Sequence, residues 1–337
     1  MRHSWAVVLA LPLFAFRCGA RAEEPPDPYD QSKAPVEVDA TDLNALKIVL
    51  VAGSRSHGPG DHEYFAGMAL LANMLKQTPN VFPVLVRDGW PKNVKIFDGA
   101  KAIAFFSDGR GGHPILQKGR LDLLQTHIAR GVGWVNLHYS VDYPRSAGDR
   151  ILTWMGGYYD EAVSINPFWK ANFKVIPEHP VTRGVKPFAQ QDEWYYNMRW
   201  CEELKGVTPL LKAVPPDGTR GTADAKKYPG REEIVAWAFE RPDGGRAFGF
   251  TGGHSHRNFA NDDLRRLLTN AILWTAKVEI PAEGAKCDLD PKDLTTNLDF
   301  KGLDPAAQLK LREEVKALKA RIAELEKENE ALKAKAK

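Results

Sequence analysis

Cysteine is scarce in this sequence, with three residues among 337. None of them lies in a Cys-x-x-Cys pair or at the spacing of a zinc knuckle, so neither kind of site is expected. A Gly-x-Ser-x-Gly turn, which would present a nucleophilic serine, is absent as well. Whether Cys201 pairs with Cys287 cannot be read from the sequence, and both could equally remain free thiols.

The sequence also lacks a large excess of charge of either sign. Lys and Arg together number 46 and Asp and Glu 43, which leaves a net charge of +3. A chain so nearly balanced has no basic surface on which phosphates would gather, and no nucleic-acid partner is expected. Because 43% of its residues are hydrophobic, the chain can still bury a full core.

A long apolar run occurs at the N-terminus, where residues 5–16 are mostly hydrophobic. The run is shorter than the roughly 20 residues that cross a bilayer, and it lies between a basic start and an Ala-Arg-Ala site, as in a signal peptide. We therefore expect cleavage of residues 1–22 before Glu23. The mature protein would be exported, periplasmic or secreted, without membrane attachment. Lipidation at Cys18 is the alternative, although Arg17 stands where a small residue is needed.

Composition divides the mature chain into four parts. Residues 23–45 are rich in Pro, Asp and Glu and lack an apolar period, as expected of a disordered linker. Residues 46–280 carry apolar strands and amphipathic helices and form one predicted domain. Residues 281–304 are expected to be a second linker, and residues 305–335 a C-terminal helix.

The predicted domain has an α/β fold. Residues 47–52 form a continuous apolar run ended by a glycine, which is typical of a strand buried on both faces of a parallel sheet. Strands and helices then alternate, which predicts a doubly wound, mainly parallel sheet in flavodoxin-like order. The further extended segments are 81–86, 100–106, 133–137, 173–176, 193–199, 210–214, 234–240 and 246–251. The predicted helices are 63–77, 116–130 and 262–277.

Histidines gather where the predicted strands end. Seven polar residues of interest lie in the segments that follow four of these strands: His57, His62, Asp108, His113, His138, His254 and His256. Parallel sheets bind their ligands beyond the carboxyl ends of the strands. The sequence therefore predicts a site at this edge of the sheet.

The same segments resemble the ThuA-like (trehalose utilisation) family, whose fold is that of class I glutamine amidotransferases. The resemblance covers about residues 47–277. It is carried by Ser56-His57-Gly58, Ser107-Asp108-Gly109, the strand end at 133–138, Asp192-Glu193-Trp194-Tyr195-Tyr196 and Gly253-His254. An amidotransferase has its catalytic cysteine after the strand at 133–137, but Leu137-His138 stands here, so glutamine hydrolysis is not expected. The resemblance implies a carbohydrate derivative, such as a 3-keto glycoside, as substrate.

Imidazoles and carboxylates in one pocket suit proton transfer, because histidine titrates near neutrality and a nearby carboxylate raises its basicity. The expected catalytic residues are His57, His138, Glu193 and His254. The expected substrate-binding residues are Asp108, His113, Tyr195 and His256. Structural roles are the alternative: His138 could be a hydrogen-bonded core histidine, Glu193 could pair with an arginine, and Asp108 could only turn the chain.

A divalent metal such as zinc is a rival use of the same residues. Neutral imidazoles with a carboxylate suit first-row ions, and His254 and His256 would point to one side of an extended segment. No His-x-x-x-His spacing supports the metal, and no nucleotide cofactor is expected. The reaction stays open among a lyase, an isomerase and a hydrolase. A non-catalytic sugar-binding module or an assembly protein are the alternatives to an enzyme.

Residues 305–335 carry a heptad repeat. Leucine occupies each d position, and two branched residues and one asparagine occupy the a positions, a pattern that favours a parallel dimer. The d residues are Leu311, Leu318, Leu325 and Leu332, and the a residues are Val315, Ile322 and Asn329. The facing charges would attract, as Glu314 with Lys319, Arg321 with Glu326 and Glu328 with Lys333. We therefore expect a parallel homodimer, with a lone charged helix as the alternative.

Overall fold

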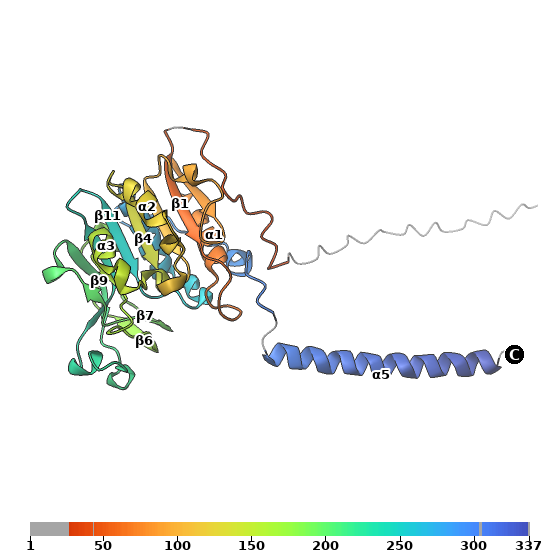
Figure 1. Cartoon of the computed structure of the whole chain (residues 1–337). Coiled ribbons are helices and arrows are strands. Elements are labelled where there is room, and N and C mark those ends of the chain that lie inside the picture. The colour runs from red at the N-terminus through yellow and green to blue at the C-terminus, as the bar shows by residue number, and fades with distance from the viewer. Residues whose placement is uncertain (1–26, 43, 303–304, 336–337) are drawn as a thin grey trace, which may run out of the picture.

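A seven-stranded sheet forms the centre of the computed structural model, which describes residues 27–42, 44–302 and 305–335. The strand order is β2-β1-β3-β4-β11-β10-β9. The bounds are β1 (Leu46–Ala52), β2 (Val81–Val86), β3 (Ala102–Phe106), β4 (Gly133–Leu137), β9 (Val207–Ala213), β10 (Glu233–Glu240) and β11 (Arg246–Phe250). Figure 1 shows the sheet with helices on both of its faces.

The first five strands of this order are parallel, and the last two run antiparallel to their neighbours. The order β2-β1-β3-β4-β11 is the flavodoxin-like one, so the predicted α/β fold is confirmed. Strands β1, β3, β4 and β11 all end at one edge. The loops that follow these four strands therefore meet in space.

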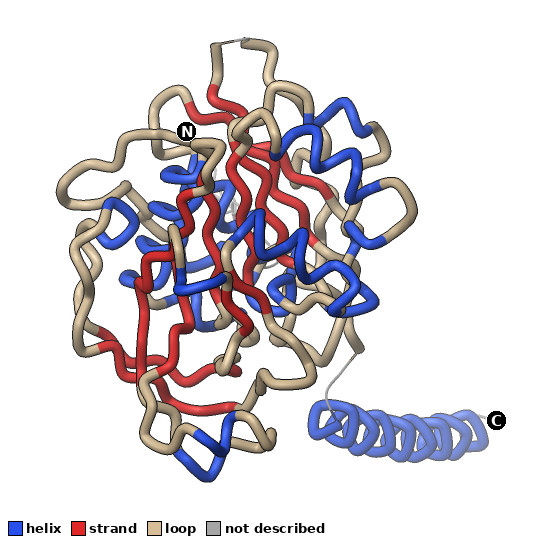
Figure 2. Tube along the Cα trace, turned by 60° about the vertical axis from the view of Figure 1, so that its left-hand side comes forward, coloured by secondary structure: helices blue, strands red, loops and turns tan. Residues whose placement is uncertain are grey.

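Both faces of the sheet are buried. Along β1, Ile48 and Leu50 belong to one apolar core, while Val49 and Val51 belong to the other. This alternation follows from the two-residue period of a strand. Full burial of such side chains contributes roughly 1.5–3 kcal/mol each. Figure 2 shows the strands in red between the helices in blue.

Four helices cover the sheet: α1 (Tyr64–Leu75), α2 (Arg120–Ile128), α3 (Arg145–Met155) and α4 (Asp262–Thr275). The start of α4 is fixed by the side chain of Asn261, which accepts hydrogen bonds from the backbone of Asp263 and Leu264. Helix α3 was not predicted; it ends at Met155 and is followed by the capping residue Gly156, whose φ of 74° suits glycine. The helix predicted at 116–130 is shorter in the structure.

Two small antiparallel sheets lie beyond the central one. Strand β5 (Gly157–Tyr158) pairs with β8 (Arg199–Trp200), and β6 (Phe168–Phe173) pairs with β7 (Phe188–Glu193). The strand predicted at 193–199 is wrong. Its aromatic run Trp194-Tyr195-Tyr196 is buried at every residue, and the chain then turns at Asn197, where φ is 55°. Buried aromatic residues were thus mistaken for a strand.

The segments expected to be linkers pack on the domain where they are described. Val36 forms a bridge with Leu85, and the backbone N–H of Glu37 donates to the carbonyl of Leu85 at 2.8 Å. At the other end, Ala285 and Cys287 are buried in the core. Apolar residues inside these polar segments explain the packing.

Other expectations concern the remaining chain. The predicted signal peptide, residues 1–22, lies outside the described residues. Among the described helices, none is long and apolar enough to cross a membrane. Cys201 and Cys287 are free thiols. The C-terminal helix α5 (Pro305–Lys335) spans the segment predicted to be helical.

Candidate functional site

Four chain segments bring a compact polar cluster to the carboxyl edge of the sheet. His62 comes from the loop between β1 and α1, His138 directly follows β4, His254 lies in the loop after β11, and Glu193 ends β7. We call His62, His138, Glu193 and His254 the His/Glu cluster. All three imidazoles are buried, and the carboxylate of Glu193 is mostly covered.

The backbone is strained at the histidines. The φ angles of His57, His62 and His138 are 58°, 47° and 53°, in the left-handed region that residues with a Cβ seldom adopt. Gly253, just before His254, has a φ of 107°. Such conformations persist where surrounding contacts hold them, and they concentrate at functional sites.

One nitrogen of each imidazole faces the centre of the cluster. The Nε2 of His62 lies 3.0 Å from the Nε2 of His138 and 2.9 Å from the Nδ1 of His254. The Oε2 of Glu193 lies 3.0 Å from the Nδ1 of His254 and 3.4 Å from the Nε2 of His138. Three imidazole nitrogens and one carboxylate oxygen, all within 4.8 Å of one another, could therefore hold a metal ion.

The other nitrogen of each histidine faces an oxygen outside the cluster. The Nδ1 of His138 lies 2.9 Å from the carbonyl oxygen of Thr251, and the Nδ1 of His62 lies 2.6 Å from the hydroxyl of Tyr64. The Nε2 of His254 lies 3.5 Å from a carboxylate oxygen of Asp61. These outer oxygens orient the rings, as the outer partners of histidine ligands do in metal sites.

The electrostatics of the cluster follow from burial and from its close neighbours. Burial lowers the pKa of His62 to about 3, helped by the nearby histidines and opposed by the carboxylate of Asp108, 3.7 Å from its Nδ1. Burial opposes the charge on Glu193, but its close contacts with the imidazoles of His138 and His254 prevail and hold its pKa well below the usual range. Burial also opposes the charge on His254, yet the hydrogen bond and charge of Glu193 raise its pKa.

The buried Asp192 shapes the loop that carries His254. One carboxylate oxygen accepts a hydrogen bond from the backbone N–H of Gly253 at 2.7 Å, and the other accepts one from that of Ser255 at 3.3 Å. The next residue, Glu193, is held through Oε1, which accepts a hydrogen bond from the side chain of Asn166 at 3.0 Å. The carboxylate of Asp192 therefore fixes the loop that carries His254, whereas the carboxylate of Glu193 faces the cluster.

The exposed side of the site carries His57 and Asp108. The ring of His57 stacks on that of His62 with centroids 3.6 Å apart. Asp108 accepts hydrogen bonds from the hydroxyls of Tyr64 at 2.7 Å and Ser56 at 2.8 Å. Burial would raise the pKa of Asp108, but the nearby imidazole of His62 and the hydrogen bonds from Tyr64 and Ser56 outweigh it and lower the pKa. His57 and Asp108 are thus ionisable groups that remain at least partly exposed beside the buried cluster.

The predicted site residues divide into two groups. His57, Asp108, His138, Glu193 and His254 come together, and the hydroxyl of Tyr195 lies 3.3 Å from the Nε2 of His138. His113 and His256 do not join them. The ring of His113 stacks on Tyr143 in the interior, and that of His256 packs against Phe259. Both side chains are buried, so a ligand at the cluster would touch neither.

His62 was left out of the predicted set although it lies at the centre of the cluster. The loop from Gly53 to Glu63 contains both His57 and His62, and periodicity says nothing about which of them points inward in an irregular loop. Tyr64 was missed too, because it reads as the first core residue of α1. The doubled histidine in one strand-end loop was the available signal for His62.

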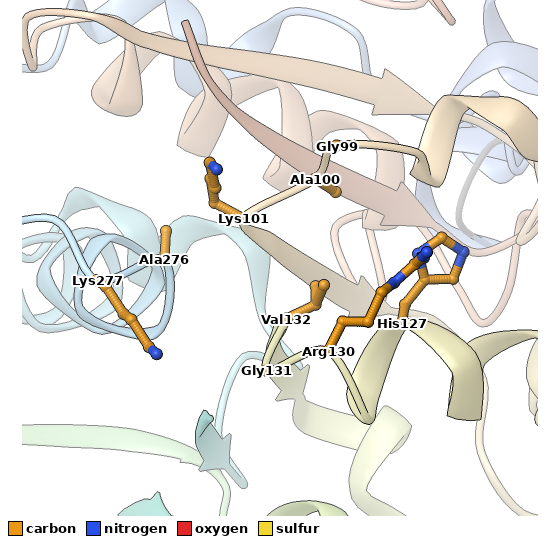
Figure 3. A pocket seen from close by; sticks show the side chains of 9 residues that line it. All are labelled: Gly99, Ala100, Lys101, His127, Arg130, Gly131, Val132, Ala276 and Lys277. Carbon is orange, nitrogen blue, oxygen red and sulfur yellow. The ribbon is translucent and has the colours of Figure 1, made fainter. Parts of the chain in front are cut away.

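A separate hollow lies at the opposite, amino edge of the sheet. It has a volume of about 440 Å³ and is lined by the starts of β3 and β4 and the ends of α2 and α4. Figure 3 shows its basic side chains, Lys101, His127, Arg130 and Lys277. His127 lies 2.8 Å from Arg130, so it is engaged locally. None of the predicted site residues lines this hollow, and it is distinct from the His/Glu cluster.

Comparison with known proteins shows which of them this chain is similar to. A protein-family model described as ThuA, trehalose utilisation, matches residues 49–275. Among solved structures, a ThuA-like protein from Bacteroides uniformis is 18% identical, with a TM-score of 0.49, over 71% of this chain and 94% of that one. PurLQS from Thermotoga maritima is 12% identical, with a TM-score of 0.39, over 68% and 99%.

A third solved structure covers a smaller share of its own chain. A cold-adapted β-galactosidase from Rahnella sp. R3 is 11% identical, with a TM-score of 0.39, over 69% of this chain and 30% of that one. No curated protein matches the sequence.

Proposed function

The chain belongs to the ThuA (trehalose utilisation) family, and from this premise we propose that it is an enzyme acting on a carbohydrate derivative such as a 3-keto glycoside. The observation that carries the proposal is the His/Glu cluster, in which three buried imidazoles and a carboxylate converge within 4.8 Å beneath the exposed ring of His57. A site built only to bind a neutral sugar does not need buried imidazoles in contact with one another.

The chemistry that suits this equipment is removal of a proton beside a carbonyl. In a 3-keto glycoside, a base takes the proton on C2. The C–H electron pair forms the C1–C2 double bond as the bond from C1 to the glycosidic oxygen breaks, and the departing alcohol receives a proton. Two proton-transfer groups are therefore required, one on each side of the step. His57 and Asp108 lie where a bound sugar reaches them, above His138, Glu193 and His254.

The carboxylate and hydroxyl contacts support these roles. The hydroxyl of Ser56 lies 2.7 Å from the Nδ1 of His57 and 2.8 Å from Asp108, so Ser56 connects the two exposed groups. Burial lowers the pKa of His57, which favours its neutral, proton-accepting form near neutrality. The aromatic ring of Phe168, more than half exposed, packs edge-on against His254 and offers a face for a sugar ring.

The test is turnover of 3-keto glycosides followed by the appearance of the unsaturated product. We expect activity in the wild type and loss of it in His138→Ala, with the far-UV circular dichroism and melting temperature showing that the variant is folded. Binding of the sugar without turnover would indicate the non-catalytic sugar-binding module instead. If the protein neither binds nor converts the sugar, the assembly role is the remaining alternative.

Export belongs to the same proposal. Enzymes that act on extracellular glycosides must leave the cytoplasm, and the sequence at residues 1–22 fits a cleaved leader. N-terminal sequencing of the native protein should begin at Glu23; an intact Met1 in a cytosolic fraction would contradict export.

A further inference from the structure

We propose that the His/Glu cluster binds one divalent first-row metal ion through the Nε2 of His62, the Nε2 of His138, the Nδ1 of His254 and the Oε2 of Glu193. The inference does not need the proposed sugar substrate to be right, because the cluster can be loaded and measured without any sugar. Its support lies in the spacing of the four atoms, in the protons that the surroundings assign to each ring, and in the outer contacts of the rings.

The spacing of the donor atoms fits an ion at their centre. Metal–nitrogen and metal–oxygen bonds of about 2.1 Å in a tetrahedral site place neighbouring ligand atoms about 3.4 Å apart. The measured separations between adjacent donor atoms in the cluster are 2.9, 3.0, 3.0 and 3.4 Å. These are four of the six pairs, and all four atoms lie within 4.8 Å of one another, so the side chains could close around an ion without rebuilding the fold.

The proton on His138 is fixed by its outer partner. A carbonyl oxygen can only accept a hydrogen bond, so the contact of 2.9 Å with Thr251 requires the proton on Nδ1 of His138. The Nε2 of a neutral His138 then carries a lone pair, and this lone pair faces the cluster.

The proton on His62 follows from the next contacts. The hydroxyl of Tyr64 donates its single proton to Asp108 at 2.7 Å, so toward His62 the same oxygen acts as an acceptor. The Nδ1 of His62 therefore carries the proton, at 2.6 Å from that oxygen, and its Nε2 carries a lone pair. Two lone pairs then meet where the Nε2 atoms of His62 and His138 lie 3.0 Å apart. Such an approach is repulsive unless a cation lies between the nitrogens.

His254 and Glu193 complete the set. Without an ion, the Nδ1 of His254 donates its proton to the Oε2 of Glu193 at 3.0 Å. An ion would displace this proton, and the ring would keep its other proton on Nε2, which faces the Asp61 carboxylate at 3.5 Å. The four inward atoms are then all electron-pair donors, and one of them carries negative charge. A divalent ion is the ligand that satisfies every one of them at once.

A competing group of possible ligands, His57, His62 and Asp108, is weaker. Asp108 already accepts hydrogen bonds from Tyr64 and Ser56, and His57 is exposed. Each nitrogen of His62 can bind an ion in only one of the two groups. Its Nε2 faces His138 and His254, the ligands of the His/Glu cluster.

Three imidazoles with one carboxylate suit zinc, manganese, iron or cobalt, and exclude the all-oxygen environment that magnesium and calcium prefer. Four protein ligands fill a tetrahedral site, so the ion would polarise a substrate oxygen as a Lewis acid only by taking that oxygen as a fifth ligand. Proton transfer would then fall to the groups outside the cluster, His57 and Asp108. This division explains why the site has a buried layer of ligands beneath an exposed layer of titratable groups.

The experiment uses the full mature protein after treatment with a chelator and dialysis. Zinc is added in excess, unbound metal is removed, and bound zinc is measured by elemental analysis; cobalt is titrated separately and followed by its visible absorption. We expect one zinc per chain, a cobalt spectrum typical of nitrogen and oxygen ligands, and a raised melting temperature in the presence of zinc.

The variants His138→Ala and Glu193→Gln should weaken zinc binding by roughly 100-fold or more, since loss of even an outer partner costs about 10- to 100-fold. His256→Gln is the matched control: it removes a buried imidazole two residues from His254 but outside the cluster, and should keep full stoichiometry. Substoichiometric zinc in the wild type would overturn the inference. So would equal affinity in wild type and both ligand variants. In either case a shared proton between His62 and His138 holds the cluster together, and the proposed enzymatic function stands or falls by its own assay.

Discussion

Asp142, four residues after His138, is buried, and only part of its carboxylate is paired with a cation or a hydrogen-bond donor. One carboxylate oxygen lies 3.2 Å from the guanidinium of Arg110, and the other has no hydrogen-bond partner among the described residues. Burial raises the pKa of Asp142 to about 7 although Arg110 acts the other way; Glu161 and Asp160 raise it further. The hydroxyls of Tyr139 and Tyr159 also lie near this carboxyl. A carboxylic acid with such a pKa is half protonated at neutrality.

The raised pKa predicts how stability changes with pH. In the unfolded chain an aspartate titrates near about 3.9, so the folded state binds this proton more tightly. The contribution of Asp142 is fully present below about pH 4 and is lost as the pH rises to about 7. Asp142→Asn cannot ionise. Between those pH values the wild type should therefore lose up to about 4 kcal/mol more unfolding free energy than the variant.

Urea unfolding of both proteins across this pH range measures the difference. Glu161→Gln is the control, since it removes an exposed neighbour of the same network and should change the slope much less. Parallel pH profiles for wild type and Asp142→Asn would show that Asp142 stays ionised in the fold.

Which histidines could be predicted depended on their place in the chain. His138 directly follows one strand and His254 lies in the short loop after another, so the strand pattern alone placed them at the carboxyl edge. His113 also follows a strand, but a short turn carries its ring back under the sheet edge onto Tyr143. His62 needed the loop conformation, with φ of 47°, to point inward. Sequence thus located the edge, while side-chain direction within irregular loops required the structure.

At the scale of elements, the segment after η10 (Pro291–Thr295) fastens the loop that carries His62. The ammonium of Lys301 lies 3.3 Å from the carboxylate of Glu63, and both side chains are almost fully buried. The same ammonium donates to the carbonyl oxygens of Asp61 and His62. Glu63 also accepts a hydrogen bond from the backbone N–H of Asp299 at 2.7 Å. This segment was expected to be a linker, yet it forms one wall of the site.

Lys301→Met should destabilise the protein by about 3 kcal/mol or more, because it leaves the buried carboxylate of Glu63 without its partner. The methionine keeps most of the apolar stem of the lysine, so the loss of unfolding free energy reflects mainly the removal of the ammonium charge. Adding Glu63→Gln to Lys301→Met should recover part of the loss. Lys292→Met breaks an exposed pair with Asp290 and should change stability by less than about 1 kcal/mol. Equal losses from Lys301→Met and Lys292→Met in urea unfolding would contradict the role of the buried pair.

Elements with strong apolar runs were predicted closely. Strands β2 and β4 were placed with both ends correct, and β10 and β11 to within one residue. Helix α3 was missed because its sequence, Arg145–Met155, contains a glycine and five polar or charged residues, and only Trp154 and its apolar neighbours face the core. Strand β6 alternates exposed and buried residues, but its exposed Phe168 obscures the alternation.

At the scale of the whole molecule, the site and the C-terminal helix are joined by a short stretch of chain. Lys301 contacts the loop of His62, and α5 begins at Pro305. Any partner held by α5 is therefore tethered within a few residues of the site. The basic hollow lies at the opposite edge of the sheet, and neither the loop of His62 nor Lys301 lines it.

The heptad face of α5 is exposed in the single chain: Val315, Leu318, Ile322 and Leu325 are between 40% and 63% accessible. Within the helix, Arg321 and Glu324 form an ion pair at 3.0 Å, which would also support a lone helix. A lone helix gains nothing from a stripe of branched and leucine side chains in water, whereas a pair of helices buries the stripe from both copies.

We propose that α5 pairs with α5 of a second copy in a parallel homodimer. Light scattering on the mature protein should give twice the chain mass, and a chain ending at Gly302 should be monomeric. Leu318→Asp places a charge in the seam and should dissociate the dimer, whereas Ala320→Asp, on the outer face of the same heptad, should not. The asparagine at the a position, Asn329, costs stability but selects two strands in register, so Asn329→Leu should raise the melting temperature and permit higher oligomers. A monomeric mature protein at micromolar concentration, or a dimer that persists without α5, would show that another surface governs assembly.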